Sequence, residues 1–101
     1  MAFVKAAAVG EIPAGEIREL QVGEKAVALA HVNGKFFALN GVCPHRGGPL
    51  GEGFMEGNTV TCPWHGWQFD VTTGKSCLNP DVGVKEYPVE IRGDEVFVDV
   101  E

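Results

Sequence analysis

Short runs of alternating apolar and polar residues, separated by turn-forming residues, fill most of this sequence. β-Branched and aromatic residues are frequent in these runs, and the periodicity of an amphipathic helix is nearly absent. Successive side chains of a strand point to opposite faces, so this alternation is typical of strands. We therefore predict an all-β fold of short antiparallel strands.

The clearest predicted hairpin joins residues 25–32 to residues 35–42 through Asn33-Gly34, a dipeptide that tolerates the positive φ angles of a tight turn. A second hairpin is expected to turn through Gly93-Asp94, and a third through residues 72–74. We also predict strands at residues 16–22, 67–71, 84–91 and 95–100.

The length and charge of the chain limit its domain count and its partners. With 101 residues it can form one hydrophobic core but not two, and no apolar run approaches the roughly 20 residues that span a bilayer. A net charge of -6 with eight Lys and Arg argues against nucleic acid or an anionic membrane as partner and favours a protein with a basic patch. Residues 1–10 lack the apolar stretch of a signal peptide, so we expect a cytoplasmic protein.

Residues 43–66 differ from the rest, because they are rich in glycine and proline and contain two Cys-His pairs. The segment CPHRGG begins at Cys43 and the segment CPWHGW begins at Cys62, with sixteen residues between the two pairs. Functional residues concentrate in loops on a rigid scaffold. We therefore expect a loop-built site at one end of a small antiparallel β-sandwich or barrel.

The two Cys-His pairs have the residue types of a metal site. In extended backbone Cys43 and His45 lie on the same side, and Cys62 and His65 can converge across a turn that Gly66 permits. A tetrahedral zinc ion could use these four ligands, although zinc sites usually take both sulfurs from one short segment. The interleaved order favours a two-iron cluster, in which each iron takes one ligand from each loop. Zinc stays open at this point.

The pattern Cys-x-His, sixteen residues, Cys-x-x-His resembles the Rieske family. The resemblance extends to RGGPL, GWQFD, EGNTVTCP and EIPAGE, and so to nearly the whole chain. It implies one [2Fe-2S] cluster per chain, with Cys43 and Cys62 on a buried iron and with His45 and His65 on an exposed iron. It also implies a single Rieske domain over residues 1–101, with two or three small antiparallel sheets and a cluster-binding subdomain at about residues 43–70.

Two sets of residues bear on the reduction potential. Histidine in place of two cysteines leaves the oxidised cluster neutral, and raises the potential into a window of about -150 to +300 mV. Aligned with high-potential members, this chain has Gly48 and Trp64 in place of a bridging disulfide, and Trp67 and Phe69 in place of Ser and Tyr hydroxyls. Fewer hydrogen-bond donors stabilise the reduced state less, so we predict a potential of about -150 mV.

The resemblance implies an electron carrier and not an enzyme. A catalytic iron held by two histidines and a carboxylate is excluded, because only His31 remains once His45 and His65 are used. The leading hypothesis is a monomeric ferredoxin that transiently accepts an electron from a flavin-dependent reductase and passes it to a terminal Rieske oxygenase of the aromatic-ring dioxygenase type. Two alternatives remain open, namely the small Rieske subunit of an assimilatory nitrite reductase and a zinc-stapled structural or interaction module.

Two residues are expected to have no role in the site. Cys77 has no free cysteine partner once Cys43 and Cys62 bind iron, so a packed or idle thiol is predicted. His31 falls within the alternation of the first hairpin, and we expect a surface or hydrogen-bonded strand histidine.

Overall fold

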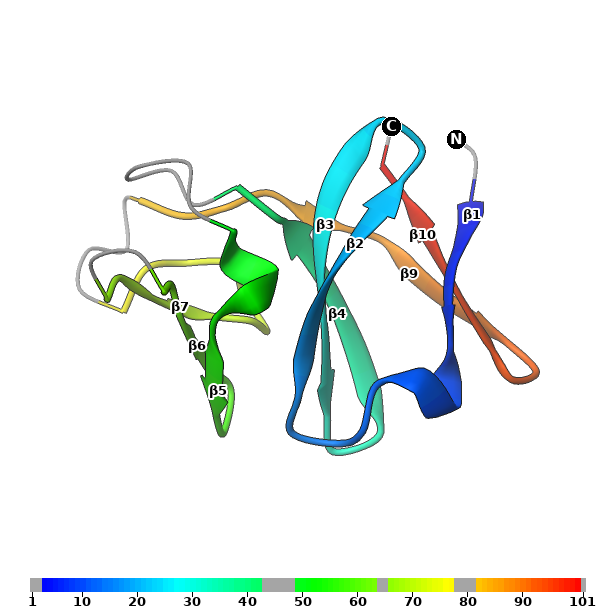
Figure 1. The fold of residues 1–101 in the computed structure, drawn as a ribbon, viewed down its shortest axis with the longest axis horizontal. Coiled ribbons are helices and arrows are strands. Elements are labelled where there is room, and N and C mark those ends of the chain that lie inside the picture. The colour runs from blue at the N-terminus through cyan, green and yellow to red at the C-terminus, as the bar shows by residue number, and fades with distance from the viewer. Residues whose placement is uncertain (1–2, 43–48, 64–65, 78–81, 101) are drawn as a thin grey trace.

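The computed structural model describes residues 3–42, 49–63, 66–77 and 82–100. These residues form three sheets and two short 3-10 helices, η1 (Val9–Glu11) and η2 (Leu50–Glu52) (Figure 1). The strands are β1 (Phe3–Ala8), β2 (Ile17–Val22), β3 (Lys25–Val32), β4 (Lys35–Asn40), β5 (Phe54–Glu56), β6 (Thr59–Thr61), β7 (Gln68–Asp70), β8 (Glu86–Tyr87), β9 (Val89–Arg92) and β10 (Glu95–Asp99). Neither helix is long and apolar enough to cross a membrane, in the part of the chain described.

The three sheets have the strand orders β1-β10-β9, β2-β3-β4-β8 and β5-β6-β7, and their strand pairs are antiparallel. The prediction of a small all-β fold with two or three antiparallel sheets is confirmed. Sheet β2-β3-β4-β8, the central sheet, lies between the other two (Figure 1). The small sheet β5-β6-β7 lies on one side of it, and the terminal sheet β1-β10-β9 lies on the other.

The predicted Asn33-Gly34 hairpin is confirmed. Asn33 has a φ of 50° and Gly34 a φ of 81°, and the register pairs Val32 with Lys35. Strand β4 ends at Asn40, two residues earlier than predicted. The chain leaves the ladder there, and Val42 forms an isolated antiparallel bridge with Pro49.

The predicted strand over residues 84–91 is wrong as a single element, because Pro88 divides it. Strand β8 pairs with β4 in the central sheet, whereas β9 pairs with β10 in the terminal sheet. Proline has no N–H to donate to a ladder, so a strand is readily interrupted there. The carbonyl of Pro88 still accepts a hydrogen bond from the N–H of Asp99, at 3.1 Å. The turn at Gly93-Asp94 is present, with a Gly93 φ of 61°.

The glycine-rich segment is more ordered than the predicted loop. It contains β5 and β6, joined through Gly57, which has a φ of 60°. Strand β6 is the ladder partner of β7. The predicted third hairpin is also present, because the chain turns after Asp70 and returns along β7 with a bridge between Phe69 and Ser76 and a hydrogen bond from the N–H of Asp70 to the carbonyl of Lys75, at 2.9 Å. Strand β1 was not predicted, and β2 confirms the strand expected at residues 16–22.

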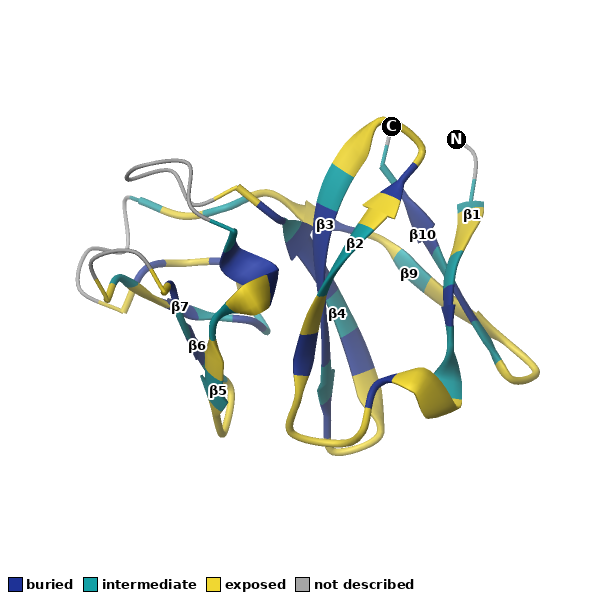
Figure 2. Cartoon of the chain, viewed as in Figure 1, coloured by how far each residue is buried: buried dark blue, intermediate teal, exposed yellow. Residues whose placement is uncertain are grey.

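The central sheet is covered on both faces (Figure 2). Alternate residues of β3 point to the two sides, so Ala28 lies in the core with Phe69, whereas Leu29 lies in the core with Val96. The larger buried residues of the first core are Ile17, Leu39, Leu50, Val60, Phe69 and Val71. The first core therefore joins the small sheet β5-β6-β7 to the central sheet.

Candidate metal centre

Cys62 follows the last residue of β6 and is 2% exposed. The register of the small sheet places Met55, Val60 and Phe69 in one row, and Val60 and Phe69 are fully buried. Cys62 belongs to the same core cluster. The sequence-predicted ligand Cys62 is therefore held at the edge of the first core, at the end of a paired strand.

Both predicted ligand loops begin and end at paired backbone positions. The bridge between Val42 and Pro49 closes residues 43–48, and the N–H of Leu50 donates to the carbonyl of Gly41 at 2.9 Å. The N–H of Cys62 donates to the carbonyl of Trp67 at 2.7 Å and closes the second loop. The predicted ligands Cys43, His45 and His65 themselves lie outside the described residues.

The return segment of the predicted third hairpin runs beside β7 and leads to a close crossing of the chain. The N–H of Cys77 donates to the carbonyl of Gln68 at 2.9 Å, and the N–H of Val84 donates to the carbonyl of Gly74 at 2.7 Å. A Cβ on Gly83 would come within 2.6 Å of the Gly74 oxygen, so the two glycines allow the chain to cross itself closely. The sequence did not predict this crossing, because two glycines do not by themselves identify one.

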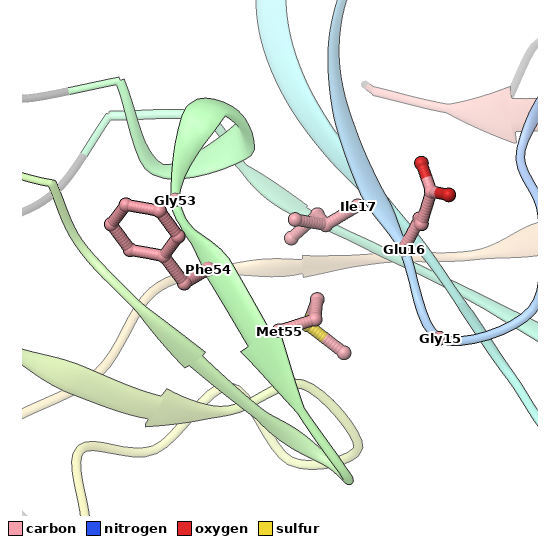
Figure 3. Close-up of a pocket in the computed structure, with 6 residues that line it drawn as sticks. All are labelled: Gly15, Glu16, Ile17, Gly53, Phe54 and Met55. Carbon is pink, nitrogen blue, oxygen red and sulfur yellow. The ribbon is translucent and has the colours of Figure 1, made fainter.

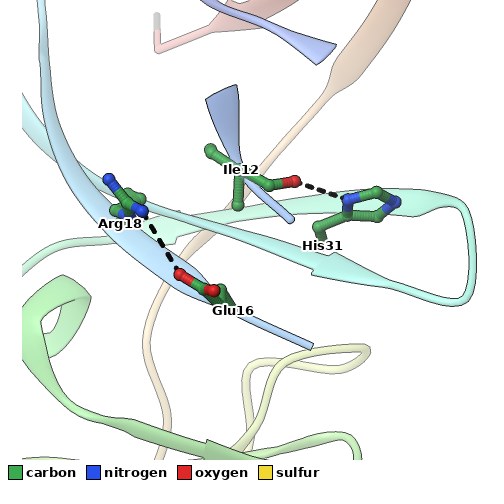
Figure 4. A network of polar contacts seen from close by, with 4 residues as sticks. All are labelled: Ile12, Glu16, Arg18 and His31. Atoms are coloured by element: carbon green, nitrogen blue, oxygen red, sulfur yellow. Dashed lines mark hydrogen bonds and ion pairs between the residues drawn. The ribbon is translucent and has the colours of Figure 1, made fainter. Parts of the chain in front are cut away.

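His31 has the structural role that was predicted. Its Nδ1 atom lies 2.7 Å from the carbonyl oxygen of Ile12 (Figure 4). Its ring stacks on Phe36 with centroids 4.3 Å apart. The neighbouring ion pair between Arg18 and Glu16, at 3.2 Å, does not involve His31. Cys77 is exposed, in agreement with an idle rather than a packed thiol.

Residues 2–88 match the family described as the Rieske [2Fe-2S] domain. This chain belongs to the Rieske family. It is 36% identical over 99 residues to the ferredoxin component of the naphthalene 1,2-dioxygenase system of Pseudomonas aeruginosa. The aligned region covers 97% of this chain and 95% of that relative.

Solved structures agree with this family. The ferredoxin of carbazole 1,9a-dioxygenase from Nocardioides aromaticivorans IC177 has a TM-score of 0.89 and 25% identity, with 97% of both chains covered. A chain in the complex of reduced oxygenase and oxidised ferredoxin in carbazole 1,9a-dioxygenase has a TM-score of 0.85 and 33% identity, with 95% of this chain and 91% of that chain covered. This Rieske protein is an electron-transfer component with a [2Fe-2S] cofactor, and is not itself the catalytic enzyme.

The surroundings of Cys62 fit a cluster ligand. A thiolate in an apolar core is costly unless a metal ion compensates its charge, and the thiolate is the form that binds metal. Among the described residues no three His, Cys, Asp or Glu side chains lie together, and three of the four predicted ligands fall outside that part of the chain. The assignment of the other three ligands therefore stays a prediction.

Phe69 shares the core cluster of Cys62 and Trp67 packs against that cluster, and neither side chain has a hydroxyl group. Phe69 is fully buried, Trp67 is half-buried against the same core, and their ring centroids are 6.4 Å apart. Gly48 and Trp64, which also entered the prediction of low potential, lie outside the described residues. The potential of about -150 mV stays a prediction.

Helix η2 attaches the small sheet to the central sheet through Gly51. A Cβ on Gly51 would overlap the backbone of Glu19 on β2, and a Cβ on Gly53 would overlap the carbonyl oxygen of Thr61. Gly51 is buried, so the two segments can approach only because this position has no side chain. This contact lies directly after the first ligand loop.

We expect Gly51→Ala to lower the free energy of unfolding by about 1–3 kcal/mol, because the added methyl group forces β2 and η2 apart. Urea unfolding followed by far-ultraviolet circular dichroism would measure the change. Gly10→Ala is the matched control, since a Cβ at Gly10 meets nothing within 4 Å. Equal effects of the two substitutions would contradict the close contact.

Glu19 makes the same junction sensitive to pH. Burial raises the pKa of the Glu19 carboxyl above its ordinary value of 4.5, and the negative charge of Glu52 raises it further. A carboxyl with a raised folded-state pKa favours the folded state when protonated, so this contribution is present below pH 4.5 and is lost as the pH rises through the folded-state pKa.

Glu19→Gln is therefore expected to be more stable than the unmodified protein at pH 7, with a smaller difference at pH 4. Urea midpoints at the two pH values would measure this, and Glu24→Gln, at an exposed turn of the same sheet, is the control. A stability difference that grows toward low pH would contradict the raised pKa.

Proposed function

We propose that Cys43, His45, Cys62 and His65 hold one [2Fe-2S] cluster, with the cysteines on the buried iron and the histidines on the outer iron. The burial of Cys62 at the edge of the first core supports its place on the inner iron. Both ligand loops begin and end at paired backbone positions, and this pairing supports the proposal that the sheets hold both loops in place.

The protein passes single electrons from a flavin-dependent reductase to a terminal Rieske oxygenase of the aromatic-ring dioxygenase type. The observation that supports this most is the near full-length likeness to the ferredoxin component of a naphthalene 1,2-dioxygenase system. The known complex between an oxygenase and a similar ferredoxin supports the oxygenase as partner. The cluster, when bound, accepts and releases one electron at a time.

The residues of the chain have three tasks in this function. The core around Cys62 excludes water from the inner ligand, the paired loop ends keep the ligand segments in place, and the acidic surface favours brief contact with basic partners. The cytoplasmic location, the monomeric state and the subdomain boundaries at about residues 43–70 stay predictions.

A reconstituted assay tests the proposed function. It combines NADH, a flavin-dependent reductase, a terminal aromatic-ring oxygenase and its substrate, with and without this chain loaded with its cluster. We expect oxidised product only when the chain is present. No dependence of product on the loaded chain, across the naphthalene and carbazole dioxygenase components, would contradict the proposal. Co-purification with a large haem-containing subunit would instead favour the nitrite reductase alternative.

A further inference from the structure

The small sheet β5-β6-β7 has an inward and an outward face. The register aligns Phe54 with Thr61 and Thr61 with Gln68, which places these three side chains in one row. The Nε2 atom of Gln68 donates to Oγ1 of Thr61 at 3.2 Å, so the row is continuous between β6 and β7. The alternate row contains the buried Phe69, and the row with Phe54 therefore faces outward.

Phe54 is unusually exposed for a phenylalanine, with 70% of its surface accessible. The other large apolar residues exposed in the described ranges are Val4, Val42 and Ile91, and none exceeds 48%. Phe54 is one of the residues that line the cleft of about 270 Å³ between β5 and β2, but Figure 3 shows that its ring projects from β5 in a different direction from the Met55 side chain. Aromatic residues are enriched in protein interfaces, and this ring lies exposed on an edge strand.

Acidic residues flank Phe54 along the chain. Glu52 and Glu56 are exposed on either side of Phe54 along the chain. Within the described residues 49–63 and 66–77 the charged side chains are Glu52, Glu56, Asp70 and Lys75, so the acidic groups outnumber the basic one. The ion pairs of Lys5, Arg18 and Arg92 lie on the other two sheets. A partner that fits this face carries positive charge around an apolar pocket.

The same face adjoins the metal centre. Thr61 directly precedes Cys62, and Gln68 directly follows Trp67, whose carbonyl accepts the N–H of Cys62. A protein bound over the Thr61 and Gln68 side chains would therefore lie beside the second ligand loop. An electron acceptor must bind at a short distance from the cluster.

We propose that the Phe54 strip, which consists of Glu52, Phe54, Glu56, Thr61 and Gln68, is a docking surface for the terminal oxygenase. The inference rests on the proposed function and adds the chemistry of the contact, in which Phe54 enters an apolar pocket bordered by Lys or Arg side chains. We name the oxygenase and not the reductase because a complex of an oxygenase with a similar ferredoxin is known.

The test uses the loaded protein in the reconstituted system that supports turnover with the unmodified chain. Phe54→Ser is compared with Ile91→Ser, which removes another exposed apolar side chain, on β9 in the terminal sheet. We expect Phe54→Ser to raise the KM of the oxygenase for this protein about tenfold with little change in kcat, and Ile91→Ser to leave KM unchanged. With cytochrome c in place of the oxygenase, the reductase-driven rate should be the same for both variants and the unmodified protein.

A second variant tests the charge. Glu52→Gln with Glu56→Gln should raise the same KM at low ionic strength, and the difference should disappear at high salt. Glu24→Gln, in a turn of the central sheet, is the matched control and should change nothing. The comparison of the double glutamine variant with Glu24→Gln remains informative if Phe54→Ser disturbs the fold.

Unchanged KM values in both Phe54→Ser and the double glutamine variant would overturn the proposed surface. An equal loss with cytochrome c would assign the strip to the reductase and overturn the assignment to the oxygenase. No turnover with the unmodified chain would contradict the proposed function itself, and the inference with it. The absorption spectrum of each variant shows that the cluster is intact before these comparisons.

Discussion

Cys62→Ser is expected to yield a protein that lacks a stable [2Fe-2S] cluster. The serine hydroxyl is a poor substitute for a thiolate toward iron, and the 2% exposure of Cys62 leaves little room for water to replace the lost ligand. Iron and acid-labile sulfide content, together with the visible absorption of the purified protein, would measure the loss. We expect both contents to fall to less than about a tenth of the unmodified protein.

Cys77→Ser provides the matched control. Cys77 is exposed, whereas Cys62 lies in the core cluster, so the same change of one sulfur to oxygen is expected to leave the cluster content and spectrum unchanged. Full iron content in Cys62→Ser, or cluster loss in Cys77→Ser, would contradict the assignment of Cys62 as the cysteine ligand of the second loop.

Phe69→Ala is expected to lower the free energy of unfolding by about 3–5 kcal/mol, because it leaves a cavity beneath β7 in the core that contains Cys62. A domain of this size has about 5–15 kcal/mol of stability in total, so the loss is large. The urea midpoint of the loaded protein under anaerobic conditions would measure it. We also expect Phe69→Ala to release the cluster at a lower urea concentration than the unmodified protein does.

Phe54→Ala is the control for this prediction, because it removes the same side chain from the other face of the same sheet. Phe54 is 70% exposed and Phe69 is fully buried, so the free energy of unfolding should change by less than about 1 kcal/mol in the control. Similar losses in the two variants would show that the register of β5-β6-β7 is not as described.

The hairpin at Asn33-Gly34 was predictable because a local dipeptide determines its turn, and both residues have the expected positive φ. The division at Pro88 was not predicted, because the choice between two sheets depends on partners far away in the sequence. Strands β5 and β6 have three residues each, which is too short for a recognisable alternation in a glycine-rich segment.

The ligand residues were predictable from their spacing and their resemblance to the Rieske family, but the surroundings were not. The close contact of Gly51 with Glu19 joins segments more than thirty positions apart in the printed sequence. The exposure of Phe54 follows from the register between β5, β6 and β7, which sequence alone does not determine. Cys62 is the one predicted ligand whose burial the described residues show.

A redox titration of the aerobically purified protein, followed by electron paramagnetic resonance, tests the central claim most directly. We predict a red-brown protein that on dithionite reduction gives a rhombic signal with an average g below that of all-cysteine clusters, and a midpoint potential of about -150 mV. A colourless protein with stoichiometric zinc and no such signal would contradict the claim.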